Sequence, residues 1–253
     1  MKQVILSAKG LCKSFAHNGG QVHILSDVNL ELCKGDFTVI MGNSGSGKST
    51  LLYALSGMDR ATAGQVLYEE KDIVAMKEKE LSKLRITEFG FVFQQMHLVS
   101  NLSIYENIAI CGYLNKEKNA QEVKLRTNEL LEQMNIGHIK THLPSQVSGG
   151  EGQRCAIARA VVNTPNILFA DEPTGALNKK NTLDVLDLFT GLNAEGQTIL
   201  MVTHDIRSAL RANRLLYLED GKIIGELSLP PYDADEEKSR EAQVNAWLSS
   251  MKW

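Results

Sequence analysis

The stretch Phe37-Thr38-Val39-Ile40-Met41, followed by Gly42-Asn43-Ser44-Gly45-Ser46-Gly47-Lys48-Ser49, decides the fold. The first five residues predict a buried strand, and Ser49–Leu55 predicts a helix. Between them, the spacing GxxxxGK[ST] is typical of a phosphate-binding loop. Its glycines allow the backbone N–H groups to turn inward toward phosphate oxygens, and the helix adds the positive end of its dipole. The stretch therefore predicts a strand, a phosphate loop and a helix in an α/β fold.

Two side chains of this loop have a defined chemistry in such sites. The Lys48 ammonium reaches the β- and γ-phosphates, and the Ser49 hydroxyl binds Mg²⁺. A chance Gly/Ser loop would give similar letters, but the required strand and helix flank this one. The predicted phosphate-binding residues are Gly42, Asn43, Ser44, Gly45, Ser46, Gly47, Lys48, Ser49 and Thr50.

A second motif is an apolar strand that ends in two carboxylates. Ile167–Ala170 is followed by Asp171 and Glu172. Beside a phosphate loop, Asp171 would hold Mg²⁺ through its water shell, and Glu172 would accept a proton from an attacking water. Standing alone, the same residues would be a solvated acidic turn.

A third motif opens an apolar helix. Ser148-Gly149-Gly150-Glu151 precedes Cys155–Val162 and lies about twenty residues before the acidic pair. The two glycines expose N–H groups at a helix N-terminus, which predicts a second anion site. Alone, this motif would be an ordinary loop and helix cap.

The composition is that of a globular protein. The 253 residues are 43% hydrophobic and 23% charged, with 27 Lys plus Arg against 30 Asp plus Glu, a formal net charge of −3. This balance argues against a strongly basic nucleic-acid binder. No apolar run approaches the length of a membrane span. The cysteines form no CxxC pair and are expected to be reduced and mostly buried; they are Cys12, Cys33, Cys111 and Cys155.

The order of predicted elements favours an α/β fold with a largely parallel sheet. Short β-like runs fill the first forty residues, with a turn at Asn18-Gly19-Gly20. A mainly helical stretch from about Ser103 to Val162 interrupts the alternation. An acidic run and a final helix follow Pro230-Pro231, with Val244, Trp247, Leu248 and Met251 on one face. The expected strands are 4–8, 22–32, 37–41, 65–68, 89–93, 167–170, 198–202 and 215–218.

Taken together and in this order, the motifs resemble those of the ATP-binding-cassette (ABC) ATPases over almost the whole chain. Ser148–Glu151 resembles the family's signature motif, Gln94 its glutamine loop, His204 its switch histidine and Phe15 its adenine-stacking aromatic residue. The resemblance implies a RecA-like P-loop ATPase core with an N-terminal antiparallel β subdomain and an α-helical subdomain inserted at about 95–163. The expected domains are an ABC ATPase over 1–230 and a tail over 231–253.

The resemblance also implies a site. ATP and Mg²⁺ are the expected cofactors, with Lys48, Glu172 and His204 catalytic. Ser49, Gln94 and Asp171 would bind the metal. The nucleotide would contact the phosphate loop, Phe15, Gln94 and, through a facing subunit, Ser148, Gly149, Gly150 and Glu151. Taken singly, Gln94 could be a polar turn and His204 a satisfied histidine; for Phe15, core packing stays an equal alternative.

Partners follow from the same resemblance. The signature motif implies that two copies sandwich two ATP molecules head to tail. Gly90–Gln95 and Asp171–Leu177 resemble the lipoprotein-release, macrolide-export, cell-division and bacitracin-type group, whose ATPases pair with FtsX-like permeases; the segment 75–81 and Arg85 look most like the bacitracin-type members. We therefore expect a peripheral subunit on the cytoplasmic face of the cell membrane, with no nucleic-acid partner, powering a permease for antimicrobial-peptide resistance or export. The segment from Met96 to Ile110 is the expected docking surface, with Met96, Leu98, Val99, Leu102 and Tyr105 as apolar anchors.

Alternatives and departures accompany this assignment. A soluble ABC ATPase in a non-transport assembly is the main alternative, and lipoprotein, macrolide or cell-division roles are open within the group. A GTPase would need an NKxD motif, which Asn178-Lys179-Lys180-Asn181 lacks. The family usually has Asp at Asn178 and a polar or basic residue at Gly152, so both departures fall on the expected dimer interface.

Overall fold

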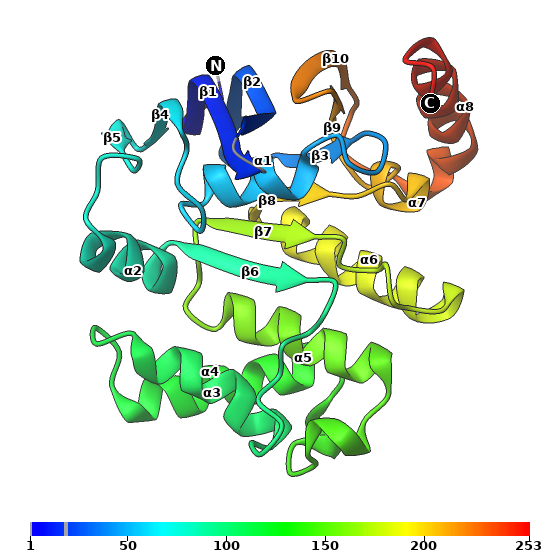
Figure 1. Cartoon of the computed structure of the whole chain (residues 1–253). Helices are drawn as coiled ribbons and strands as arrows, with labels where there is room; N and C mark the ends of the chain where they lie inside the picture. Colours follow the sequence, from blue (N-terminus) through cyan, green and yellow to red (C-terminus); the bar gives the residue numbers. More distant parts are fainter. Residues whose placement is uncertain (1, 18–19) are drawn as a thin grey trace. The chain divides into compact units, whose positions relative to one another are not determined.

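The computed structural model describes residues 2–17 and 20–253, which form two compact units. The first unit contains residues 1–81 and 193–253, and the second contains residues 82–192 (Figure 1). The helices α2 (Glu78–Thr87) and α6 (Lys179–Ala194) run across the boundaries.

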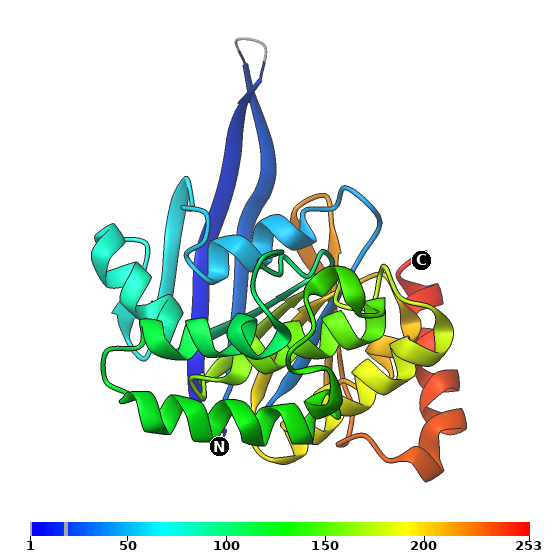
Figure 2. The same ribbon diagram turned by 90° about the horizontal axis from the view of Figure 1, so that it is seen from below.

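The first unit holds the expected antiparallel subdomain. Its strand order is β2-β1-β4-β5, with β1 (Val4–His17), β2 (Gly20–Cys33), β4 (Ala63–Tyr68) and β5 (Lys71–Asp72). Pairing between β1 and β4 ends at Cys12, whereas pairing between β1 and β2 continues to His17, so the two blue strands extend past β4 (Figure 2). The first two strands are therefore longer than predicted. Of the predicted turn, residues 18 and 19 lie outside the described residues.

The same unit holds the strand that precedes the phosphate loop. β3 (Phe37–Met41) pairs in parallel with β8 (Thr198–Val202) and with β9 (Arg214–Glu219), which agrees with the predicted parallel sheet. Every residue of β3 and β8 is buried, as expected for strands covered on both faces. β10 (Lys222–Ser228) pairs antiparallel with β9 and was not predicted, because its residues are exposed or half-buried. The helices α1 (Lys48–Leu55) and α7 (Ile206–Ala209) follow β3 and β8.

The tail packs on the first unit. After a 3-10 turn at Ala234–Glu236, α8 (Glu237–Ser250) buries Val244 and Leu248, and the Trp247 ring lies 6.3 Å from that of Tyr217. The predicted apolar stripe thus faces the chain's own strands. The domain boundary at residue 230 stays a prediction.

The second unit combines two strands with a helical part. β6 (Phe89–Phe93) and β7 (Ile167–Asp171) are parallel. The predicted helical stretch forms α3 (Ile104–Leu114), α4 (Ala120–Gln133) and α5 (Gly149–Val161), with 3-10 turns at Gly137–Ile139 and Pro144–Gln146. Each of the three α-helices begins with a capping box, in which the cap side chain and a residue three positions later bond each other's backbone. The prediction of mostly buried cysteines is wrong: all four are free, but only Cys155 is buried.

Candidate active site

The phosphate loop wraps around the Lys48 ammonium. Lys48 is buried, and its Nζ donates to the carbonyls of Gly42 (2.7 Å) and Asn43 (3.0 Å). Gly42, Gly45 and Gly47 have positive φ angles of 153°, 84° and 101°. A side chain at Gly42 would also overlap the carbonyl oxygen of Leu218. Glycine is therefore required both by the backbone turn and by close approach.

The end of this loop suits an anion. Gly47 caps α1 without a side-chain hydrogen bond, whereas α3, α4 and α5 are capped by side chains. The start of α1 is the positive end of the helix dipole, which favours an anionic ligand. The Ser46 hydroxyl is buried and has no hydrogen-bond partner within the described chain. An unpaired buried hydroxyl is costly, and a phosphate oxygen would satisfy it.

His204 lies at the strand end next to the loop. Ile40 is paired with Val202, and Thr203 N donates to Ile40 O at 3.2 Å. His204 follows and is exposed, in the turn before α7. Asp205 accepts from Arg207 N at 3.0 Å and so caps that helix. The predicted loop and switch histidine therefore emerge from neighbouring strands at the edge where ligands of parallel sheets bind.

Phe15 is not a core residue. Its side chain is 44% exposed, and Lys13 Nζ lies 4.7 Å from its ring centroid. It pairs with Val22, while a methyl group added at Gly47 of the phosphate loop would lie 3.1 Å from Ile24 O and 3.2 Å from Leu25 Cδ2 of the same strand. Core packing, the alternative interpretation of Phe15, is thereby excluded.

In the second unit, the acidic pair and Gln94 come together. Phe93 ends β6 directly opposite Asp171, which ends β7. Gln94 and Glu172 are the next residues on the two strands. Asp171 is buried, whereas Glu172 is half-buried. Glu172 has φ +46°, a left-handed conformation that is unusual for a side chain of its kind and is common at functional sites.

The candidate metal ligands suit Mg²⁺. Ser49, Gln94 and Asp171 offer a hydroxyl, an amide oxygen and a carboxylate, and hard cations prefer oxygen ligands. The described residues contain no cluster of three or more His, Cys, Asp or Glu side chains that could hold a metal.

The signature residues form the N-cap and first turn of α5. Ser148 Oγ donates to Glu151 Oε2 at 2.7 Å, and Ser148 N donates to the same oxygen at 2.8 Å. These bonds lower the pKa of Glu151, and His138 Nε2 lies 3.3 Å from its other oxygen. Ser148 and Gly149 are exposed, while Gly150 is buried against the Asn181 amide.

Sequence reasoning did not find Gln153 and Arg159, and it placed Asn178 at the dimer interface without finding its role as a helix cap. Asn178 Oδ1 accepts from Asn181 N at 3.0 Å and so caps α6. Gln153 and Arg159, on α5, donate to backbone carbonyls between residues 93 and 97. A polar residue on the buried face of an apolar helix was the available signal for Gln153, which is 1% exposed.

Comparison with known proteins decides the family. Residues 25–175 match the model of the ABC transporter family. The chain belongs to this family. Its ATP-binding cassette has the α/β ATPase fold that the motifs predicted.

Relatives are consistent with this assignment. The chain is 40% identical over 222 residues to the macrolide export ATP-binding/permease protein MacB of Aggregatibacter actinomycetemcomitans, covering 88% of this chain and 34% of the relative. It is 36% identical over 256 residues to MacB of Pasteurella multocida, covering 100% of this chain and 38% of the relative. The cassette thus spans about a third of the length of these relatives.

Solved structures share the fold. A dimeric post-hydrolysis structure of the ATP-binding cassette MJ0796 with ADP and Pi has a TM-score of 0.83 and 35% identity, covering 90% of this chain and all of the other. CbiO1 of Clostridium perfringens, part of the transporter complex cbiONQ, has a TM-score of 0.80 and 28% identity, covering 96% and 93%. Among the described residues of the present cassette, no helix is long and apolar enough to cross a membrane.

Proposed function

We propose that this ABC cassette hydrolyses ATP with Mg²⁺ and drives an integral membrane permease. The observation that supports nucleotide binding most strongly is the phosphate loop, which brings together the positive end of α1, an unpaired Ser46 hydroxyl and the Lys48 ammonium. Membership of the ABC family makes ATP the nucleotide.

Each residue then has a role. Residues 42–50 hold the phosphates, and Lys48 turns from its loop carbonyls to the β- and γ-phosphates. Ser49, Gln94 and Asp171 would hold Mg²⁺, which would supply positive charge to neutralise the phosphates. Glu172 accepts the proton of the attacking water, and His204 positions the γ-phosphate.

A second copy of the cassette completes each site. Ser148, Gly149, Gly150 and Glu151 form the start of α5, where Ser148 and Gly149 are exposed and the positive end of the helix suits an anion presented by another molecule. The dimeric MJ0796 structures support such a pair.

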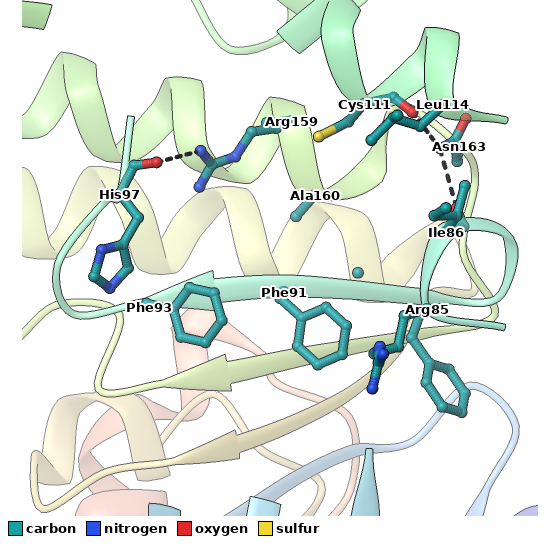
Figure 3. A pocket seen from close by; sticks show the side chains of 12 residues that line it. Arg85, Ile86, Phe91, Phe93, His97, Cys111, Leu114, Arg159, Ala160 and Asn163 are labelled. Atoms are coloured by element: carbon teal, nitrogen blue, oxygen red, sulfur yellow. Dashed lines mark hydrogen bonds between the residues drawn. The ribbon is translucent and has the colours of Figure 1, made fainter. Parts of the chain in front are cut away.

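The permease is proposed to dock on a pocket of the second unit. The pocket holds about 320 Å³ and contains the stacked rings of Phe91 and Phe93, with Arg159 and Cys111 across from them (Figure 3). Beside it, α3 exposes Ile110, Tyr113 and Leu114 by 42%, 52% and 56%. The predicted anchors differ, since only His97 of the segment 96–110 lines this pocket.

The pocket's charge indicates the occupant. Its lining includes Arg85, Arg159 and His97 and no carboxylate. We propose a short cytoplasmic helix of an FtsX-like permease that presents apolar side chains and an acidic residue. The MacB relatives, which are ATP-binding/permease proteins longer than this chain, support that pairing. Macrolides or antimicrobial peptides are the proposed cargo, and the cytoplasmic membrane face is the proposed location.

Glu172→Gln tests the chemistry. ATP binding should persist while turnover falls by about 10²–10⁴-fold, the usual cost of losing a general base. The variant should accumulate as an ATP-bound dimer in size-exclusion chromatography. Hydrolysis at the wild-type rate would refute this role of Glu172.

Leu114→Glu tests the docking surface. Co-expressed with the permease, the wild-type cassette should fractionate with membranes, and Leu114→Glu should be released from them. Leu125→Glu is the matched control, because Leu125 is 57% exposed on α4 and does not line the pocket. A soluble complex without any membrane protein would favour the non-transport alternative.

A further inference from the structure

The signature helix has a notch that is filled by a side chain of the glutamine loop. Gly149 and Gly152 lie three positions apart on α5 and so share one face. A methyl group at Gly152 would overlap Sδ of Met96 and lie 3.8 Å from Leu98 Cδ1. At Gly149, a methyl group would lie 4.0 Å from Cε of Met96. The Met96 thioether therefore occupies the space that a side chain at Gly152 would fill, and it lies within van der Waals reach of one at Gly149.

Backbone hydrogen bonds hold the same loop against the same helix. Gln153 Nε2 donates to Phe93 O at 3.1 Å. Farther along α5, Arg159 donates to Met96 O at 2.7 Å and to His97 O at 2.8 Å. Residues 93–97 are thus attached to α5 at three positions of the helix: at Gln153 and Arg159 by hydrogen bonds, and at Gly152 by the Met96 side chain.

Glycine at position 152 has a cost and a benefit. Inside a helix, glycine is less favourable than alanine because it loses more backbone entropy. Here it admits a flexible, polarizable side chain from a segment more than fifty residues away in sequence. The departure from a polar or basic residue at this position therefore has a packing reason.

We infer that Met96, seated in the Gly149–Gly152 notch, is a positioning residue that transmits movement of the Gln94 loop to the signature turn Ser148–Glu151. The inference rests on the proposed nucleotide roles of Gln94 and Ser148. Well-packed contacts transmit displacement because they have little free volume. A movement of the Gln94 loop on nucleotide binding would displace Met96. Because Met96 is seated in the notch, this displacement would shift the first turn of α5.

Gly152→Ala tests this link. The new methyl group would take the place of Met96, whose flexible side chain can move away, while α5 keeps a good helix former. Gly191→Ala is the matched control, because Gly191 is also in a helix, is exposed and has no atom within 4 Å of the position that a methyl group would take. Hydrogen exchange of the full chain would be measured with and without ATP and Mg²⁺, at a protein concentration where size-exclusion chromatography shows monomers only, so that no facing subunit's nucleotide contacts residues 148–152.

In the wild type and in Gly191→Ala, nucleotide should change the exchange of amides 93–97 and 148–152 together. In Gly152→Ala, the response at 148–152 should be lost while that at 93–97 remains. Met96→Ala should give the same loss, and adding Gly152→Ala to it should cause no further loss, since both changes remove one contact.

Two outcomes would overturn the inference. One is an unchanged response at 148–152 in both single variants; the other is a response of the wild type at 42–49 but not at 148–152. No response at 42–49 would instead refute nucleotide binding, so failure of the link and failure of the proposed function are distinguishable.

Discussion

The Gln94 side chain lies directly against Gly175. A methyl group at Gly175 would lie 2.8 Å from Nε2 and 3.2 Å from Cδ of Gln94. Gly175 belongs to the turn after β7, where its N–H donates to the Glu172 carbonyl at 3.0 Å. The turn that carries the proposed general base therefore also determines where the proposed metal-binding amide can lie.

Gly175→Ala should lower the affinity of the site for Mg²⁺. The methyl group would push the Gln94 amide from its place without removing it, so the effect resembles the loss of a supporting contact around a metal ligand. Such losses cost about 10- to 100-fold in metal affinity. A Mg²⁺ titration of ATPase activity should show a higher half-saturating concentration, with Gly191→Ala unchanged. Equal titration curves for Gly175→Ala and the wild type would contradict the role of Gln94.

Asn178 should tolerate aspartate but not alanine. Because its Oδ1 caps α6, Asn178→Ala should lower the free energy of unfolding by about 1 kcal/mol. Asn178→Asp keeps the acceptor and adds a negative charge at the positive end of the helix, so its stability should equal or exceed that of the wild type. Urea denaturation measures both. A wild-type stability for Asn178→Ala would show that the cap is not needed.

The motifs and most of the fold were predictable because they are local in sequence. The phosphate loop, the acidic strand end and the capping residues depend on spacings of a few positions. Contacts such as those of Met96 with Gly152 and of Arg159 with His97 join residues more than fifty positions apart, and no pattern in one sequence specifies them. β10 escaped prediction because it pairs with β9 without burying a regular apolar face.

Arg240 should be important for the stability of the tail. It is buried and donates to the carbonyls of Leu210 (2.6 Å), Pro230 (2.9 Å) and Ala212. Arg240→Ala would leave these acceptors unpaired and should lower the free energy of unfolding by about 2–4 kcal/mol. The exposed Lys238→Ala on the same helix is the control for thermal unfolding. Equal melting temperatures for the two variants would contradict this account.

The capping box of the signature helix should depend on pH. Because bonds from Ser148 lower the pKa of Glu151 below 4.5, the ionised carboxylate is favoured by folding. Its contribution is therefore complete above the ordinary carboxyl pKa and is lost as the pH falls through the lowered value. The difference in unfolding free energy between the wild type and Glu151→Gln should narrow below pH 4.5. If the difference in unfolding free energy stayed constant as the pH falls below 4.5, titration of Glu151 would not contribute to the stability of the helix.

Phe15 should bind the adenine ring by stacking. Lys13 Nζ covers one face of the Phe15 ring, and the side chain is 44% exposed. Phe15 belongs to the β1–β2 hairpin, whose second strand lies beside Gly47 of the phosphate loop. Aromatic stacking on a base is worth about 1–3 kcal/mol, so Phe15→Ala should weaken ATP binding by about 5- to 150-fold. Phe15→Tyr should keep the affinity, because the ring is preserved.

Val22→Ala is the control, since Val22 is the cross-strand partner of Phe15 and is also 44% exposed. Titration calorimetry with the Glu172→Gln background would measure binding without turnover. A loss of affinity shared by Phe15→Ala and Val22→Ala would assign the effect to the hairpin as a whole and not to stacking.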